Sequence, residues 1–294
     1  MTRQMKVAIA GGAGGVGSSL AFNLLVRPEP FDVVVIDRRP QKVLSHVMDL
    51  EQVLALGGGR SVRPGEYDDL TSADVVVVCA AERLTENTSR SVYLAGNTRI
   101  VEAIAERLRG WDGVLIMVTN PVDALCSRLG GDRRKVLGYT LNDSLRLRTA
   151  IAQARGVAAD RVDAWMLGEH GDAGVPIFSR VRIDGEPVSL SAQERSAAHE
   201  FVRTWYRRHV ALDSRRSSTW TTGAGVAQMI CGLRSGVDTV ASVRLEGEYG
   251  IDGVSLGVPI TLGPGGVQAI HEWELAEDEL AALHRAAGVI LRAI

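Results

Sequence analysis

The sequence is poor in the features that mark several large classes of protein. Its 33 Lys and Arg residues nearly balance 35 Asp and Glu, which gives a formal net charge of −2. Without a basic excess, the chain has no electrostatic footprint for DNA or RNA. Aromatic residues make up only 5%, so stacking platforms for single strands are not expected either. The composition therefore argues against a nucleic-acid partner.

Cysteine and long apolar runs are also scarce. The three cysteines, Cys79, Cys126 and Cys231, form no CxxC pair and show no zinc spacing, so no metal is expected. A small, odd number of thiols suits a reducing cytoplasm. The longest apolar run, Val75 to Ala81, is well short of the roughly 18 residues of a membrane span. Because Met1 to Lys6 contains no signal-peptide core, the sequence predicts a cytoplasmic protein without a membrane partner.

What remains is an ordinary globular composition, with 46% hydrophobic and 23% charged residues. In the first half, strands are expected at 6–10, 33–36, 75–78 and 114–118, and helices at 18–26 and 100–108. Unbroken Val and Ile runs indicate strands buried on both faces. Because these strands alternate with helices, the first half predicts an α/β domain with a Rossmann-type, doubly wound parallel sheet.

The second half has a different pattern, and we expect a domain boundary near residue 142. Helices are predicted at 144–155, 191–210, 219–233 and 274–294, strands at 162–167 and within 242–262, and a hairpin around Asp184-Gly185. Phe201, Val202, Trp205 and Tyr206 form one stripe of the 191–210 helix, which fits either a core face or a subunit interface. Residues 1–142 are therefore predicted to form one domain, and residues 143–294 a mixed α+β substrate and catalytic domain.

A glycine loop separates the first strand from the first helix. In this context a dinucleotide can bind, because glycines let the backbone approach the pyrophosphate and the helix N-terminus offers N–H groups. The spacing of Gly11, Gly14 and Gly17 is slightly wider than the common GxGxxG, and a plain flexible turn is the alternative. The candidate cofactor-binding residues here are Gly11, Gly12, Gly14, Gly15, Val16 and Gly17.

An acid follows at the position where ribose is bound. Asp37 ends the second strand, about 20 residues after Gly17. A carboxylate there accepts hydrogen bonds from ribose hydroxyls and repels a 2′-phosphate, which favours NAD. Arg38 and Arg39 follow directly and could hold a 2′-phosphate, so NADP stays open as the less favoured cofactor. The alternative for Asp37 is a plain strand-end turn residue.

Three further segments hold polar side chains suited to catalysis. Thr119-Asn120-Pro121-Val122-Asp123 follows the fourth strand, at the carboxyl edge where ligands bind in such sheets. Asn142-Asp143-Ser144-Leu145-Arg146 opens a helix and places Asp143 and Arg146 on one face. Gly168-Glu169-His170-Gly171-Asp172 places a histidine between glycines.

Hydride transfer to a keto acid calls for such groups. It needs a proton donor near pH 7, which histidine supplies, and an adjacent carboxylate fixes the tautomer of that histidine. It also needs an anchor for the carboxylate, which the arginine fork supplies, and a group that polarises the carbonyl. A lone histidine or arginine is more often structural or on the surface, so the argument depends on all three segments together.

Taken in their order along the chain, these segments resemble the malate/lactate dehydrogenase family of NAD-dependent 2-hydroxy acid dehydrogenases. Within that family, they resemble the malate enzymes more than the lactate enzymes. The resemblance runs nearly end to end. It is carried by the GGAGGVG loop, Asp37, a Met48-Asp49-Leu50 turn, Asn97, TNPVD, NDSLRLR, GEHGD and Gly257-Val258-Pro259-Ile260. The spacing from Asp143 to His170 is also the one that this family uses.

The resemblance implies a role for each matching residue. His170 would be the proton donor and acceptor, and Asp143 the carboxylate that orients it. Arg146 would clamp the substrate's carboxylate, while Arg90 would close over the substrate and polarise its carbonyl. The remaining positions would line the cofactor and substrate sites: Asn97, Val118 and Thr222 at the cofactor, Ser218 at the substrate, and Asn120 at both. The family forms dimers and tetramers, so a homodimer or homotetramer is expected.

The sequence departs from the family in the loop from Ala81 to Arg90. Leu84 occupies the position that selects the substrate's distal group, where malate enzymes have arginine and lactate enzymes glutamine. The apolar side chain of leucine can replace neither the arginine nor the glutamine. Three interpretations follow: Arg83 shifts by one residue to serve as the malate arginine, the substrate carries an apolar or unusual side chain, or Leu84 packs in a loop that no longer closes.

Asn142 is a second departure, because the family usually places leucine before the aspartate. A buried amide needs hydrogen-bond partners. Asn142 therefore either contacts a polar group of the substrate or is satisfied locally within its turn.

We therefore expect an oxidoreductase that transfers a hydride between NAD(H) and a 2-hydroxy/2-oxo acid, with malate and oxaloacetate as the leading pair. Leu84 makes a different 2-hydroxy acid the main alternative. The altered loop also suggests an NAD-binding sensor that has lost catalysis, although Arg90, Asp143, Arg146 and His170 are all retained. An NAD-dependent glycosidase would need metal-ligating Cys and His, and the sequence shows no such cluster.

Overall fold

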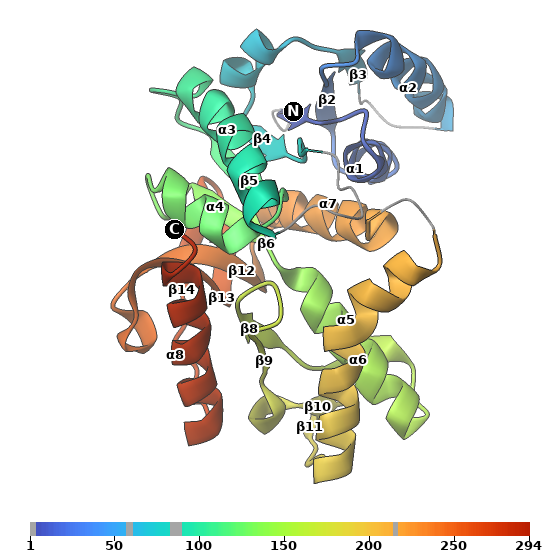
Figure 1. The fold of residues 1–294 in the computed structure, drawn as a ribbon. Coiled ribbons are helices and arrows are strands. Elements are labelled where there is room, and N and C mark those ends of the chain that lie inside the picture. Colours follow the sequence, from blue (N-terminus) through green and yellow to red (C-terminus); the bar gives the residue numbers. More distant parts are fainter. Residues whose placement is uncertain (1–3, 57–60, 83–89, 214–216) are drawn as a thin grey trace.

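The structure, a computed structural model, describes residues 4–56, 61–82, 90–213 and 217–294, with positions 90–92 described in their backbone alone (Figure 1). The strands are β1 (Met5–Ala10), β2 (Phe31–Ile36), β3 (Ser61–Pro64), β4 (Val75–Val78), β5 (Val114–Met117), β6 (Val136–Tyr139), β7 (Val162–Asp163), β8 (Met166–Gly168), β9 (Gly174–Pro176), β10 (Arg182–Ile183), β11 (Glu186–Pro187), β12 (Val237–Glu246), β13 (Asp252–Gly263) and β14 (Gly266–Ile270). The helices are α1 (Gly15–Leu25), α2 (Pro40–Val53), α3 (Arg90–Arg107), α4 (Val122–Leu129), α5 (Leu141–Arg155), α6 (Ala192–Ala211), α7 (Thr219–Ser235) and α8 (Glu277–Leu291).

The parallel half of the sheet has the predicted doubly wound architecture. Its strands lie in the order β3-β2-β1-β4-β5-β6, and every neighbouring pair is parallel. Val7 of β1 packs in one core with Leu20 of α1 and Val226 of α7. The next residue, Ala8, packs in a second core with Ile104 of α3. Helices therefore cover both faces, which is why these strands are apolar throughout.

The strands of the second half continue the same sheet. β12 pairs antiparallel with β6, and the sheet extends from there through β13, β8 and β9. At Gly257 of β13, a Cβ would lie 2.8 Å from the carbonyl oxygen of Gly168 in β8. Glycine at this position therefore allows β8 to approach β13, and the GEHGD segment begins at the end of β8. The GVPI segment thus supports the placement of that turn.

The structure departs from the predicted helices and strands at the following positions, among others. Met48-Asp49-Leu50 is part of α2 rather than a turn. Pro40 opens α2, and Val43, Val47 and Leu50 form its buried stripe. The predicted 162–167 strand is two strands in different sheets, because β7 pairs with β10 and β8 with β13. The 100–108 helix already begins at Arg90, and the 274–294 helix is limited to Glu277–Leu291.

The predicted hairpin is confirmed by the structure. The hairpin connects β10 to β11 through Asp184 and Gly185, which both have positive φ. The stripe on α6 is partly a core face, since Val202 is buried and Phe201 packs against the same core, whereas Tyr206 is exposed. No helix among the described residues is long and apolar enough to span a membrane.

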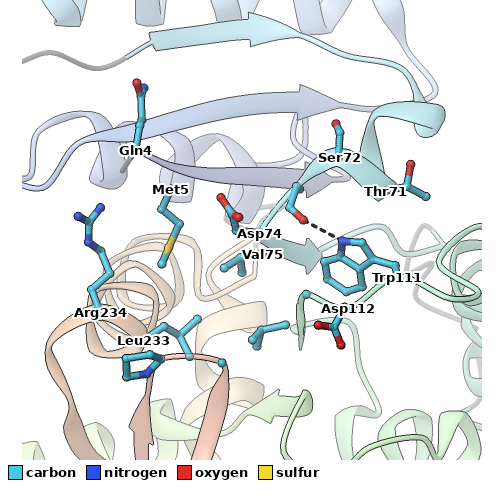
Figure 2. A pocket seen from close by; sticks show the side chains of 15 residues that line it. Gln4, Met5, Thr71, Ser72, Asp74, Val75, Trp111, Asp112, Leu233 and Arg234 are labelled. Atoms are coloured by element: carbon cyan, nitrogen blue, oxygen red, sulfur yellow. Dashed lines mark hydrogen bonds between the residues drawn. The ribbon is translucent and has the colours of Figure 1, made fainter. Parts of the chain in front are cut away.

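A hollow of about 740 Å³ lies at the amino ends of the parallel strands (Figure 2). Met5 and Val75 line it together with Trp111, Arg234 and the Pro264 turn. The indole of Trp111 donates to the carbonyl of Ala73 at 2.8 Å. None of the predicted site residues lines this hollow, because they follow the opposite, carboxyl ends of the strands.

Candidate active site

The glycine loop crosses the carboxyl edge of the sheet close to β4. The backbone N–H groups of Gly11 and Gly12 donate to the carbonyl of Ile36 at 2.8 Å. Gly11 has φ +84°, and a Cβ there would lie 2.5 Å from the nitrogen of Ala80. Only glycine combines this backbone conformation with so close an approach. The loop is thus fixed between β2 and β4.

Helix α1 begins within the predicted loop, at Gly15, so Gly15, Val16 and Gly17 form its first turn. The N-cap residue, Gly14, offers no side-chain hydrogen bond, and the first turn of α1 contains no acid. Its N–H groups and helix dipole are therefore unopposed at the N-terminus, which is the arrangement that holds a pyrophosphate. The loop fits a dinucleotide.

Asp37 lies at the end of β2, where its side chain is only 6% exposed. Arg39 donates to it through Nε, Nη2 and its backbone nitrogen, at 2.9, 3.0 and 3.1 Å. Burial raises the pKa of Asp37, but these hydrogen bonds and the charge of Arg39 outweigh that effect and lower it. Asp37 is thus ionised, and any hydroxyl group that bound there would share its oxygens with the guanidinium of Arg39.

Asn97 connects two loops at the same edge. Its side chain is fully buried in α3. The amide nitrogen donates to the carbonyl of Asn120 at 2.7 Å, and the amide oxygen accepts from the backbone of Glu82 at 2.8 Å. Val118, half-buried, follows β5 two residues before Asn120, which is exposed. The structure thus brings the predicted Asn97 and Asn120 together.

His170 lies in a tight turn after β8, closed by a hydrogen bond from Gly171 N–H to the carbonyl of Glu169. Its Nδ1 is 2.6 Å from Oδ2 of Asp143 on α5. Its backbone N–H donates to Oδ2 of Asp123 on α4 at 2.7 Å. Two buried carboxylates therefore hold the residue, one by the ring and one by the main chain. Because Nδ1 faces Asp143, the ring presents Nε2 to other partners.

The electrostatics of this pair favour the charged histidine. Burial lowers the pKa of His170, but the charge and hydrogen bond of Asp143 more than offset it, so the pKa is raised. Burial likewise raises the pKa of Asp143, yet His170 and Arg146 reverse the effect and lower it. Burial raises the pKa of Asp123 to about 6. The site is therefore built to hold an imidazolium beside an ionised Asp143.

Arg146 lies one turn after Asp143 on α5. Its Nη1 donates to Oδ1 of Asp143 at 2.7 Å, and its side chain is 15% exposed. The guanidinium carbon lies 4.1 Å from the ring centre of Trp205 on α6. Asp143 is thus shared between His170 and Arg146, which brings the three predicted residues together.

Helix α7 is connected to α5 by a buried network around Asn142. The Asn142 amide oxygen accepts from the hydroxyl of Tyr139, and its nitrogen donates to Oγ1 of Thr222, both at 2.8 Å. Thr222 donates in turn to the carbonyl of Ser218, the N-cap residue of α7. The amide of Asn142 is thus satisfied in part locally, by Tyr139 three residues earlier, and in part by Thr222 on α7, 80 residues later. The expected contact of Asn142 with a polar group of the substrate stays a prediction.

Part of the predicted substrate site lies outside the described residues. This applies to Arg83 and Leu84, and Arg90 is described only as the first backbone position of α3. The three interpretations of the loop therefore remain predictions. Within the described ranges, no group of three or more His, Cys, Asp or Glu side chains could hold a metal ion.

Sequence reasoning assigned no role to three residues of this site: Asp123, Tyr139 and Trp205. The position of Asp123 in the sequence does indicate its role. A carboxylate in the first turn of a helix that follows a sheet edge is well placed to accept backbone hydrogen bonds. Tyr139 lies only three residues before its partner Asn142, but the sequence pattern does not indicate that their side chains meet. Trp205 meets Arg146 only when α5 and α6 pack together.

Two family models match almost the whole chain. Residues 5–134 match the lactate/malate dehydrogenase NAD binding domain, and residues 140–294 match the lactate/malate dehydrogenase alpha/beta C-terminal domain. The chain belongs to the lactate/malate dehydrogenase family. The predicted family, fold class and reaction class are thereby confirmed.

Among the curated relatives and solved structures similar to this chain, some are named malate dehydrogenase and others lactate dehydrogenase. The chain is 35% identical over 294 residues to malate dehydrogenase from Halobacterium salinarum, covering 96% of each chain. It is 33% identical to L-lactate dehydrogenase 2 from Lactiplantibacillus plantarum, covering 98% of this chain and 97% of the relative. The crystal structure of Cryptosporidium parvum malate dehydrogenase aligns with a TM-score of 0.92 at 26% identity, over 99% and 98% of the two chains.

The buried network generates a prediction about stability. Asn142→Leu should lower the free energy of unfolding by about 1–3 kcal/mol, because the Tyr139 hydroxyl is left buried without its acceptor. Tyr139→Phe should then cost less in the Asn142→Leu background than in the unmodified chain. Urea unfolding of the four proteins measures both effects. Additive losses would show that the two side chains are not coupled.

Proposed function

We propose that this dehydrogenase reduces a 2-oxo acid reversibly to the 2-hydroxy acid with NADH, and that malate and oxaloacetate are its natural pair. The observation that carries the proposal is the sharing of Asp143 between His170 and Arg146. A proton donor and a carboxylate anchor are thereby fixed one beside the other. Residues 1–142 would bind the cofactor and residues 143–294 would supply the catalytic groups.

Each residue has a definable task in this reaction. Bound NADH supplies the hydride that C2 of the oxo acid receives. His170 gives the proton at Nε2 to the carbonyl oxygen, while Asp143 holds Nδ1 and stabilises the imidazolium. Arg146 receives the substrate's carboxylate on its N–H edge, and Arg90 polarises the carbonyl. Ser218 and Asn120 contribute to the substrate site, and Leu84 is its specificity position.

The cofactor we propose is NAD, with NADP less favoured. The glycine loop, the uncapped start of α1 and the buried carboxylate of Asp37 support it. Asn97, Val118, Asn120 and Thr222 complete the proposed cofactor site. The guanidinium of Arg39 on Asp37 is the feature that leaves some capacity for a 2′-phosphate.

Loss of the histidine tests the reaction class. His170→Asn should reduce turnover of NADH with a 2-oxo acid by about a hundredfold or more, while NADH binding persists. Absorbance at 340 nm with oxaloacetate, pyruvate and a branched 2-oxo acid measures it, with NADPH in parallel. His271→Asn, which changes a histidine paired with Thr261 outside the site, serves as the control. Unchanged turnover in His170→Asn would contradict the proposal.

The same assay separates the interpretations of the substrate. A preference for oxaloacetate that Arg83→Ala abolishes would identify Arg83 as the cation for the second carboxylate. A preference for the branched acid would replace malate by an apolar 2-hydroxy acid and place Leu84 in the pocket. If NADH binds but no 2-oxo acid is turned over, the NAD-binding sensor is the interpretation that remains.

The raised pKa of His170 predicts the pH dependence. Reduction needs the imidazolium, so its kcat/KM should fall as pH rises through a pKa above the usual histidine value of about 6.5. Asp143→Asn removes the charge that raises this pKa, so the falling limb should move to lower pH. Asp163→Asn, which changes a half-exposed carboxylate on β7, should leave the profile in place. A limb that does not move would contradict the pairing.

We also propose that the chain acts in the cytoplasm as a homodimer or homotetramer. Its three cysteines are free, which supports a reducing compartment. Large apolar side chains are exposed on α1, α2 and α7, including Phe22, Met48 and Trp220. A second copy could cover this face.

Light scattering tests the assembly. We expect a mass two or four times the 31.5 kDa of one chain. Met48→Glu should shift the mass toward the monomer at low concentration, because it places a charge on the apolar face. Leu280→Glu, at a less exposed apolar position on α8, is the matched control. A monomer for the unmodified chain would refute the assembly.

A further inference from the structure

The guanidinium of Arg146 lies on an aromatic ring from another helix. Its carbon is 4.1 Å from the ring centre of Trp205. Arg146 belongs to α5 and Trp205 to α6, which run close together in the lower part of Figure 1. The guanidinium thus has two neighbours of different kinds, the carboxylate of Asp143 and the face of an indole.

We propose that Trp205 is a positioning residue that presents Arg146 to the substrate's carboxylate. The inference rests on the proposed function, because it assigns to Arg146 the binding of that carboxylate. Trp205 acts through Arg146 and does not itself take part in the chemistry.

The geometry of a guanidinium explains why an aromatic ring suits this task. The group is planar, and its five N–H donors point outward in that plane. Stacking on Trp205 uses the face of the plane and consumes no donor. Asp143 takes a hydrogen bond from Nη1. The planar edge can therefore still form the paired hydrogen bonds that a carboxylate accepts.

The stack also prepares Arg146 before the substrate arrives. A long arginine side chain loses rotamer freedom when it is fixed, and that loss weakens binding if it falls on the binding step. Contact with the ring restricts the side chain in advance. The indole also keeps water from one face, which strengthens the attraction between the guanidinium and an incoming carboxylate. Both effects act on substrate affinity rather than on the transfer of hydride or proton.

Trp205 is itself held in place. His209 stacks on the indole, with ring centres 4.9 Å apart and planes 14° apart. On the same helix, Val202 is buried in the core between α5 and α6. The ring therefore has a fixed position from which to support Arg146.

The chain contains a matched control for this contact. Arg148, two residues after Arg146 on the same helix, lies 4.3 Å from the ring centre of Trp165. This second stack has no contact with Asp143 or His170 among the hydrogen bonds of the described residues. Trp165→Phe therefore changes an Arg–Trp contact of α5 outside the site.

The test compares Trp205→Ala, Trp205→Phe and Trp165→Phe with the unmodified enzyme. Trp205→Ala should raise KM for the 2-oxo acid about tenfold and change kcat by less than twofold, with Kd for NADH unchanged. Trp205→Phe should restore most of the affinity, because a phenyl ring still offers a face. Trp165→Phe should leave KM unchanged. In an Arg146→Gln background, Trp205→Ala should change KM by less than twofold, since the group that it positions is absent.

An unchanged KM in Trp205→Ala would overturn the inference, as would an equal effect of Trp205→Ala with and without Arg146. An equal rise of KM in Trp165→Phe would assign the effect to α5 as a whole and overturn it too. Titration of oxamate into the protein–NADH complex, followed by NADH fluorescence, separates this failure from that of the proposed function. Oxamate binding that depends on Arg146 and Trp205 without turnover would contradict the function and keep the inference. Absence of both turnover and oxamate binding would overturn both.

Discussion

The site depends on one buried carboxylate. Asp143 accepts from the ring of His170 at 2.6 Å and from Arg146 at 2.7 Å, with a side chain only 12% exposed. A buried anion is unfavourable unless opposite charges and hydrogen bonds compensate it. His170 on one carboxylate oxygen and Arg146 on the other supply that compensation. The net effect is a lowered pKa of Asp143. Asp143 therefore needs both partners, and each partner is oriented by it.

The fold connects these three groups to the glycine loop through one sheet and one helix. The sheet continues from β6 into β12, β13 and β8, so the turn that carries His170 is fixed to the same sheet as the loop after β1. Asp123 holds this turn by its main chain. Helix α7 completes the connection, because Thr222 receives the amide of Asn142. At the start of the same helix, a Cβ on Gly15 would lie 3.1 Å from Oγ1 of Thr219, so α7 packs directly on the cofactor loop. The two halves of the site are thereby held at a fixed separation.

The sequence was sufficient where residue type and local spacing carry the chemistry. Gly11 to Gly17, Asp37, and Asp143 with Arg146 lie within single strand–turn–helix units, and their period places them without knowledge of the rest. Contacts between distant elements could not be derived in this way. The amide nitrogen of Asn142 has its partner 80 residues away, and Trp205 meets Arg146 only through the packing of α5 on α6. Helix α2 includes Met48-Asp49-Leu50, for which the family motif predicts a turn, although Val43, Val47 and Leu50 are spaced for one buried face.

In the proposed function, the sharing of Asp143 would also couple substrate binding to protonation. The positive charge of Arg146 lowers the pKa of His170, opposing the two carboxylates around it. A carboxylate bound on Arg146 would cancel part of that opposing charge. The pKa of His170 would then rise further in the complex than in the free protein. If Arg146 anchors the oxo acid as proposed, it also strengthens the hold of His170 on the proton that the reduction consumes, and the proposed anchor and acid act as one electrostatic unit around Asp143.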